Sequence, residues 1–165
     1  MDTKRPAPAA RRPGTAAAPT ADYEPSGLGW VRDHVEQIMR TGTTDGVTIK
    51  GFPTVLMTYR GARTGKTRKT PVMRVEHGGS YAAVASNGAE PTNPKWYASV
   101  VAEPLVELQD GTVNRTYRAR EVFGDEKASW WARAVDAYPD YAEYQVKTER
   151  LIPLFVLDPA DAPAG

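Results

Sequence analysis

The first apolar pattern along the chain predicts a helix between Ser26 and Arg40. Its apolar residues recur three and four positions apart, as one face of a helix requires. They are Trp30, Val31, Val35, Ile38 and Met39. Ser26 is suited to cap the start of this helix, and Gly42 is suited to its end, where a left-handed residue is favoured. The face is expected to pack on the core, with a ligand pocket or a membrane surface as alternatives.

Beyond this helix the pattern predicts short strands, with further helices inserted late. Strands are expected over residues 47–50, 53–59, 67–76, 81–85, 105–109, 112–122 and 152–157. Glycine-containing turns at residues 77–80 and 110–111 predict hairpins. Helices are expected from Pro94 to before Pro104, after Asp125 as a cap, and after Pro139. Because strands and helices do not alternate, we expect an α+β domain whose antiparallel sheet curls into a small barrel.

The N-terminal residues differ in composition from the rest of the chain. Residues 1–22 are rich in Ala, Pro and Arg and contain no valine, isoleucine or leucine. Such a segment buries too little apolar surface to offset its ordering entropy, which predicts a disordered basic arm. Residues 23–165 are then expected to form one domain, which is large enough to build a core without disulfides.

Composition argues against several kinds of chemistry. The chain contains no cysteine, and its two histidines, His34 and His77, lie outside any metal-ligand motif. No metal site is therefore expected. The lack of cysteine fits a reducing cytoplasm. No apolar run reaches the roughly 20 residues that span a membrane, and the N-terminus lacks the apolar core of a signal peptide.

The charges are unevenly distributed, although the net charge is only +1 at pH 7. Residues 50–75 contain no acidic residue, and their basic residues are Lys50, Arg60, Arg63, Lys66, Arg68, Lys69 and Arg74. A local basic cluster on a nearly neutral protein favours a compact anionic ligand over a long nucleic acid. A nucleic-acid binder that uses the basic arm is therefore the weakest alternative.

The segment GARTGKT, residues 61–67, lies at the centre of this cluster. It resembles a nucleotide-binding P-loop, but three residues separate its glycines instead of four, and strand residues follow where a P-loop opens a helix. The dinucleotide-binding Gly-x-Gly-x-x-Gly fingerprint is also absent. What remains is a glycine-bearing hairpin loop whose backbone N–H groups and arginines suit a phosphate. A solvated basic turn is the alternative.

Four segments resemble, in the same order, the deazaflavin-dependent nitroreductase family. They are residues 58–65 with 68–71, residues 85–89 with 94–97, residues 138–145 and residues 150–153. The resemblance covers roughly residues 47–158. It implies an antiparallel split β-barrel of the FMN-binding type and a reduced deazaflavin, coenzyme F-420, as cofactor. The implied reaction is hydride transfer to an electron-poor acceptor such as a quinone, an enone or a nitroaromatic compound.

The resemblance also implies roles for individual residues. The cofactor-binding residues would be Arg60, Arg63, Thr64, Gly65, Lys66, Arg68, Pro71, Val72, Met73, Ser86, Asn87, Trp96 and Ser99. The substrate-binding residues would be Trp30, Tyr138, Tyr141 and Tyr144. From the chemistry of hydride transfer we also expect Ser86 and Tyr138 to act catalytically, as hydrogen-bond donors to an acceptor oxygen that gains negative charge. The family often has Asn where this chain has Ser99.

The spacing of the three tyrosines can also be interpreted without the resemblance. Tyr138, Tyr141 and Tyr144 recur every third residue, so they form a broad stripe on one side of a short helix. Core packing explains such a stripe equally well. Buried phenols still need hydrogen-bond partners, and a pocket wall that faces a quinone or nitro oxygen would provide them.

Two functional alternatives to hydride transfer from a deazaflavin remain open at this stage, in addition to the nucleic-acid binder. An FMN-dependent enzyme could use the same barrel, because FMN also carries a phosphate. A binding module could hold the deazaflavin or a lipid-like molecule without turnover. The expected partners are a small-molecule acceptor and a separate enzyme that re-reduces the deazaflavin, and peripheral membrane contact would involve the N-terminal helix. The expected location is the cytoplasm or its membrane surface.

Overall fold

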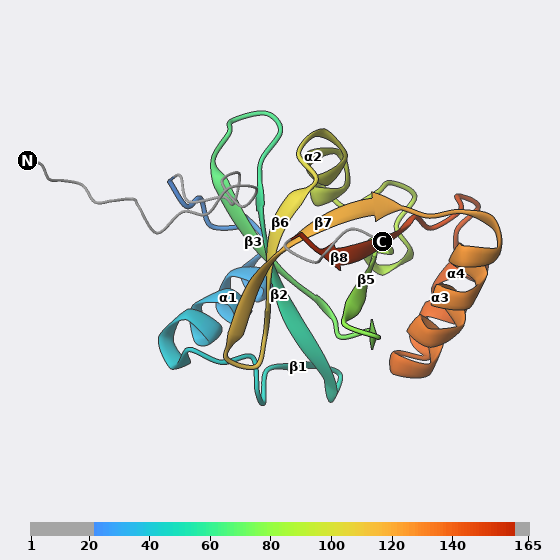
Figure 1. Ribbon diagram of the computed structural model, residues 1–165, viewed down its shortest axis with the longest axis horizontal. Helices are drawn as coiled ribbons and strands as arrows, with labels where there is room; N and C mark the ends of the chain where they lie inside the picture. The colour runs from blue at the N-terminus through green and yellow to red at the C-terminus, as the bar shows by residue number, and fades with distance from the viewer. Residues whose placement is uncertain (1–21, 161–165) are drawn as a thin grey trace, which may run out of the picture.

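One antiparallel sheet curls into a split barrel, and helices cover its outside (Figure 1). The computed structural model describes residues 22–160. The eight strands follow the order β1-β2-β6-β7-β8-β5-β4, and β3 pairs with β2 outside this path. Every strand pairing is antiparallel. The predicted α+β class and curled antiparallel sheet are therefore confirmed.

The bounds of the elements follow the predicted ones closely. The strands are β1 (Thr48–Ile49), β2 (Phe52–Arg60), β3 (Thr67–Met73), β4 (Glu76–His77), β5 (Ser80–Val84), β6 (Leu105–Asp110), β7 (Val113–Glu121) and β8 (Leu154–Pro159). The helical elements are α1 (Gly29–Thr41), the 3-10 turn η1 (Asn87–Ala89), α2 (Trp96–Ala102), α3 (Gly124–Ala137) and α4 (Asp140–Lys147). The predicted hairpin turns fall between β4 and β5 and between β6 and β7.

The strand predicted over residues 67–76 divides in the structure, and β3 ends at Met73. The Arg74 N–H still donates to the Pro53 carbonyl of β2, at 3.1 Å. The Val75 carbonyl, however, accepts a hydrogen bond from the Ala82 N–H of β5, at 2.8 Å. The chain thus changes its partner strand between these two residues, a tertiary effect that local alternation does not reveal.

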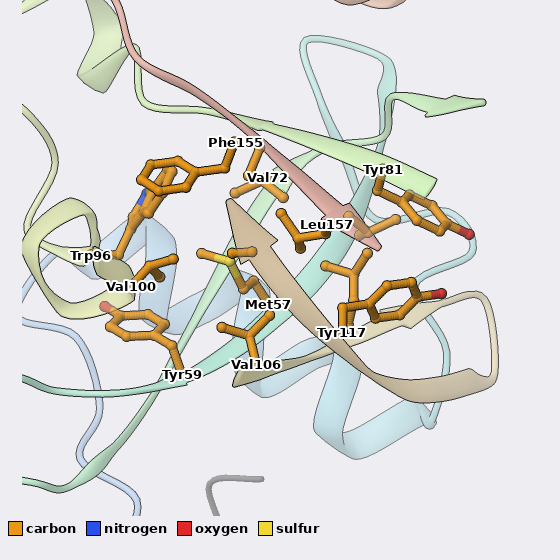
Figure 2. Packing of buried hydrophobic residues seen from close by; sticks show 14 of the residues in the cluster. Met57, Tyr59, Val72, Tyr81, Trp96, Val100, Val106, Tyr117, Phe155 and Leu157 are labelled. Atoms are coloured by element: carbon orange, nitrogen blue, oxygen red, sulfur yellow. The ribbon is translucent and has the colours of Figure 1, made fainter. Parts of the chain in front are cut away.

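Successive residues of β2 face opposite sides of the sheet. Met57 and Tyr59 belong to the cluster inside the barrel, whereas Leu56 packs under α1. Figure 2 shows the barrel cluster around Met57, with Trp96 towards one end and Tyr117 towards the other. Because Trp96 is buried in this cluster, α2 is anchored at one end of the barrel.

Helix α1 lies over β3 and buries Val31, Val35 and Ile38 there. It ends at Gly42, as predicted, which has a φ of +80° and donates its N–H to the Ile38 carbonyl at 2.7 Å. The prediction that Ser26 caps its start was wrong. The helix begins three residues later, and Ser26 Oγ accepts a hydrogen bond from the N–H two residues on, at 3.1 Å.

Two residues of the predicted apolar face of α1 are exposed. Trp30 and Met39 retain 51% and 55% of their accessible surface. The nine positions between them turn a helix through about two and a half turns, so the two side chains point to opposite sides. The buried face of α1 is therefore narrower than the pattern predicted, and these exposed residues do not form one stripe.

Helices α3 and α4 cover the part of the sheet that contains β5 and β8. Trp130 of α3 and Tyr141 of α4 are buried in a second cluster with residues of these strands. The prediction that Asp125 caps α3 was wrong, because the helix begins at Gly124 and Phe123 takes the N-cap position. Asp125 lies instead in the first turn, where a carboxylate interacts favourably with the helix dipole.

The residues before α1 lie against β3 as a short additional strand. Tyr23 forms a parallel bridge with Thr67. The Thr67 N–H donates to the Asp22 carbonyl, and the Glu24 N–H donates to the Thr67 carbonyl, both at 2.8 Å. Residues 22–24 are termed the N-terminal strap below. The predicted disordered arm, residues 1–22, lies outside the described residues except for Asp22.

Two general properties concern the described part of the chain. Within residues 22–160, no three or more His, Cys, Asp or Glu side chains gather where they could hold a metal ion. No helix of the same residues combines the length and the apolar character needed to cross a bilayer. The histidines His34 and His77 lie on different elements, α1 and β4.

Candidate functional site

The basic glycine loop joins β2 to β3 and projects from the same end of the barrel as α2 (Figure 1). Two backbone hydrogen bonds of 2.8 Å close it, from Gly61 N–H to the Lys66 carbonyl and from Gly65 N–H to the Gly61 carbonyl. Gly65 has a φ of +72°, which glycine adopts without strain. Arg60 braces the loop by donating to the Gly65 carbonyl at 3.1 Å. A strand follows, as predicted, so the loop is not a P-loop.

The cations of this loop differ in their partners. Arg63 and Lys66 are exposed, and their side chains make no hydrogen bond or ion pair with another residue of the described chain. Arg68, at the start of β3, is partly buried and pairs with Glu24 of the N-terminal strap at 3.2 Å. The loop therefore presents two uncompensated positive charges and a third that already has a carboxylate partner.

Lys69 belongs to a different environment from Arg68, because neighbouring strand residues face opposite sides. Its Nζ donates to Thr58 Oγ1 at 3.0 Å and lies 6.0 Å from the centre of the Tyr23 ring. Burial lowers the pKa of Lys69. Lys69 is thus a structural lysine beneath the strap, although it is part of the same basic run in the sequence.

Ser99 supports the loop from α2. Its buried hydroxyl accepts a hydrogen bond from the Ala62 N–H at 3.0 Å. The contact joins residues 37 positions apart, and it fixes the loop backbone to the helix that Trp96 anchors in the barrel. Ser99 therefore braces the loop backbone from α2.

Replacing Ser99 with alanine is expected to loosen this loop. Loss of one partly buried hydrogen bond costs about 1 kcal/mol of stability, and because an anion would bind the ordered loop, its affinity is expected to fall by at most about fivefold. Titration of coenzyme F-420, the cofactor that the sequence resemblance implies, into both proteins measures the change. Ser129→Ala on α3, an exposed serine, is the matched control. Equal affinities of Ser99→Ala and the unchanged protein would contradict the supporting role.

The segment after β5 contains the second group of predicted residues. Ser86 is buried, and the next three residues, Asn87, Gly88 and Ala89, have φ values of +50°, +62° and +70°. Asn87 Nδ2 donates to the Thr92 carbonyl at 3.0 Å, which holds the segment on the way to α2. Residues 86–89 are termed the Ser86 turn. Three consecutive left-handed residues, two of them with a Cβ, make this turn strained.

The three tyrosines gather at the start of α4. The rings of Tyr138 and Tyr141 are 5.0 Å apart, and those of Tyr138 and Tyr144 are 6.1 Å apart, measured between centroids. The hydroxyl groups of Tyr138 and Tyr144 share a hydrogen bond of 3.2 Å. Burial raises the pKa of Tyr138 and of Tyr141. The phenols of Tyr138 and Tyr141 therefore keep their protons at neutral pH.

The β1–β2 hairpin holds the tyrosine cluster from one side. Phe52 packs edge-on against Tyr138, with 5.4 Å between ring centroids. Lys50, in the hairpin turn, forms an ion pair of 2.8 Å with Asp140 at the start of α4. The pairing lowers the pKa of Asp140, so this carboxylate stays ionised beside the phenols at neutral pH.

The structure thus brings the predicted residues together in two groups. The loop and α2 make one group, with Ser99 as the link. The Ser86 turn and the tyrosines make the other, because α4 lies beside η1. Pro71, Val72 and Met73 are buried in β3, in the half of the strand away from the loop. Trp30 contacts His34 of its own helix, with 5.6 Å between ring centroids, and is separate from both groups.

Comparison with known families shows where this chain belongs. A family model described as F420H(2)-dependent quinone reductase matches residues 30–159. This chain belongs to the F420H(2)-dependent quinone reductase family. Its relatives in Mycobacterium tuberculosis include Rv3178, assigned to the same family and 36% identical over 110 residues, which are 67% of this chain and 92% of that protein. The F420H(2)-dependent quinone reductase Rv1261c is 32% identical over 108 residues, 64% of this chain and 72% of that protein.

Solved structures support the split-barrel fold of this quinone reductase family member. The F420-H2 dependent reductase FDR-A is 52% identical, with 64% of this chain and 94% of that chain covered and a TM-score of 0.62. A domain-swapped dimer is 51% identical, with 81% of this chain and 100% of that chain covered and a TM-score of 0.64. The heme storage protein HutZ of Vibrio cholerae, at 13% identity and a TM-score of 0.51, shares the fold.

The sequence did not single out Arg150 as a residue of the site. Its side chain lies against the Ser86 turn and bonds four oxygen atoms there. The sequence showed it only as part of a matching segment, residues 150–153. The local pattern at this position, an arginine followed by Leu-Ile-Pro, indicates the start of a buried strand. It does not indicate which groups the guanidinium contacts.

Proposed function

We propose that this chain transfers a hydride from reduced coenzyme F-420 to a quinone-type acceptor. Family membership supports the reaction type. The observation that locates the proposed cofactor site on the molecule is the glycine loop, which has two exposed, uncompensated cations, Arg63 and Lys66. The deazaflavin, when bound, supplies the hydride, and the protein supplies position and electrostatic field.

The residues of the loop fit the phosphate and acidic tail of this cofactor. Arg63 offers a planar fork of donors and Lys66 a mobile point charge, and both suit phosphate or carboxylate oxygens. The left-handed Gly65 lets a ligand approach the backbone closely. Arg60 and Ser99 would act indirectly, by holding the loop, and Thr64 and Arg68 would complete the clamp. Residues 71–73, Asn87 and Trp96 would line the space for the ring.

The acceptor would lie between the Ser86 turn and the tyrosines. Its oxygen gains negative charge as its ring receives the hydride, and a proton from solvent then completes the quinol. Ser86 and Tyr138 would donate hydrogen bonds to that oxygen. Because the phenol of Tyr138 keeps its proton at neutral pH, it stabilises this charge without being consumed. Tyr141 and Tyr144 would form the wall behind the acceptor.

A titration followed by an acceptor panel tests the proposal. The purified chain is expected to bind reduced and oxidised F-420 more tightly than FMN or FAD. With reduced F-420 it is expected to reduce quinones. The readout is the change in absorbance as reduced F-420 is oxidised, compared with a control that contains no enzyme. A protein that purifies yellow and prefers FMN would favour the alternative flavin. Tight F-420 binding without reduction of quinones, enones or nitroaromatics would favour a cofactor-binding module.

Two partners belong to the same proposal. Each turnover leaves oxidised F-420, so a separate enzyme would have to reduce it again. Peripheral membrane contact would use the exposed Trp30 of α1, which retains 51% of its surface, and Trp is favoured at membrane interfaces. Co-sedimentation with anionic lipid vesicles checks this contact, with Trp30→Ala as the comparison.

A further inference from the structure

Arg150 makes a distinctive set of contacts at the Ser86 turn. Its guanidinium donates to the carbonyl oxygens of Ser86 (2.6 Å), Ala85 (3.1 Å) and Glu90 (3.0 Å) and to Asn93 Oδ1 (2.7 Å). None of these acceptors is a carboxylate. Burial lowers the pKa of Arg150, but an arginine remains protonated in proteins. The side chain is therefore a cationic brace that binds the backbone on both sides of the turn.

Peptide geometry converts these contacts into an orientation of the turn. The carbonyl and the N–H of a trans peptide point in opposite directions. Because Arg150 holds the carbonyls of Ala85 and Ser86, the N–H groups of Ser86 and Asn87 point away from the guanidinium. Neither N–H has a hydrogen-bond acceptor among residues 22–160. Arg150 thus fixes the direction of two free backbone donors and of the backbone that carries the Ser86 side chain.

The turn needs such a brace because it is strained. Asn87 and Ala89 adopt positive φ values although each carries a Cβ, and residues of this kind disfavour that region. Strained conformations persist only where the surroundings determine them, and they are concentrated at functional sites. Inside the turn, the Ala89 N–H to Ser86 carbonyl bond of 2.9 Å and the Glu90 N–H to Asn87 carbonyl bond of 3.1 Å add support.

The brace is itself held by the tyrosine helix. Gln145 of α4 donates from Nε2 to the Arg150 carbonyl at 2.8 Å. Gln145 Oε1 accepts a hydrogen bond from the Ile152 N–H at 3.0 Å. A continuous series of hydrogen bonds therefore runs from the helix that carries Tyr141 and Tyr144, through Gln145 and Arg150, to the Ser86 turn.

We propose that Arg150 is a positioning residue of this site. It fixes the Ser86 turn against the tyrosine helix, so that the Ser86 hydroxyl and the adjacent N–H groups meet the acceptor oxygen that gains negative charge. The inference rests on the proposed function, which places the acceptor at Ser86. Arg150 contacts neither acceptor nor cofactor and transfers no proton, and it acts through the geometry of Ser86.

Replacing Arg150 with lysine separates geometry from charge. Lysine keeps the charge, but its three donors on a flexible stem cannot bridge four separate oxygens. The kcat of quinone reduction is expected to fall about tenfold to a hundredfold, as misplacement of a site by about 1 Å can produce. The Kd for F-420 is expected to change less than kcat. Arg120→Lys, on the outer surface with Glu126 and Asp158 as partners, is the matched control with unchanged turnover.

Two further measurements show whether Arg150 acts through Ser86. In a Ser86→Ala background, Arg150→Lys should add little further loss of kcat, because residues that act as a unit are not additive. Millimolar guanidinium should restore part of the kcat of Arg150→Ala, whereas methylammonium should not. Losses that multiply in the double variant, or equal rescue by both ions, would overturn the positioning role.

Hydrogen exchange of the backbone amides of residues 86–90 separates this inference from the proposed function. Exchange there is expected to rise in Arg150→Lys relative to the unchanged chain. If the unchanged chain reduces quinones, an unaltered kcat in Arg150→Lys overturns the inference. If the unchanged chain reduces no quinone, the proposed function fails, and hydrogen exchange alone tests the role of Arg150. Faster exchange in Arg150→Lys would then support the bracing of the Ser86 turn by Arg150, and unaltered exchange would overturn it.

Discussion

Replacing Arg63 and Arg68 together with alanine should weaken F-420 binding by roughly a hundredfold or more, the largest effect expected for this chain. Each hydrogen bond to a charged group contributes about 1.5–3 kcal/mol, and about 1.4 kcal/mol corresponds to a tenfold change in Kd. The remaining affinity should also depend less on ionic strength, because salt screens the charges that the change removes. Cofactor titrations at low and at high salt measure both effects.

The two single variants should differ, and the difference tests the partners seen in the structure. Arg68 pairs with Glu24, so binding of the cofactor by Arg68 must first break this ion pair. The net gain in binding free energy from Arg68 is therefore smaller. Arg63 has no such partner among the described residues. Arg63→Ala should therefore weaken binding more than Arg68→Ala. Arg40→Ala and Arg118→Ala, both exposed and outside the loop, are the controls, and equal affinity of the double variant and the unchanged chain would remove the loop from the site.

Replacing Tyr138 with phenylalanine should lower the turnover of quinone reduction by roughly tenfold to a hundredfold while the affinity for F-420 holds. The change keeps the ring and its packing against Phe52 but deletes the hydroxyl. Removing one donor to a developing oxyanion typically costs about a hundredfold to a thousandfold, and Ser86 would compensate in part. Single-turnover oxidation of bound reduced F-420 by a quinone measures the step directly.

Tyr81→Phe is the matched control for Tyr138→Phe. It removes a phenol that donates to Asp110 at 2.6 Å, outside the two groups of site residues. Turnover per folded molecule should be unchanged in this control. A Tyr138→Phe variant with undiminished turnover would exclude this hydroxyl from the reaction and leave the tyrosine cluster as core packing.

Local rules were sufficient for much of the fold and for the position of the loop. The glycine turns fixed the hairpins, because positive φ at residues 78, 79 and 111 is available to glycine without strain. The basic run without acids located the loop correctly between two strands. The end of α1 followed from Gly42. The starts of α1 and α3 did not, because α1 begins three residues after Ser26 and α3 begins one residue before Asp125.

The contacts that matter most within the site were not predictable from local pattern. Glu24 and Arg68 are 44 positions apart, and Arg150 lies 64 positions from Ser86. No periodicity or motif pairs such residues, because the fold alone brings them together. Trp30 fits the apolar face of α1 by spacing but is exposed in the structure, since spacing does not say how wide the covering surface is. In each of these cases tertiary packing, and not local sequence preference, determines the contact or the exposure.

The uncovered edge of β3 has a consequence for how molecules of this protein behave towards each other. Among the described residues β3 pairs with β2 on one side, and on the other its backbone is bonded only at Thr67, to Asp22 and Glu24 of the N-terminal strap. An open strand edge invites a second chain to add to the sheet and so promotes aggregation. Pro71 lacks the N–H that such an added strand requires, and a charged Lys69 discourages it. The composition of β3 therefore leaves one edge of the sheet open while it keeps the protein from polymerising along that edge.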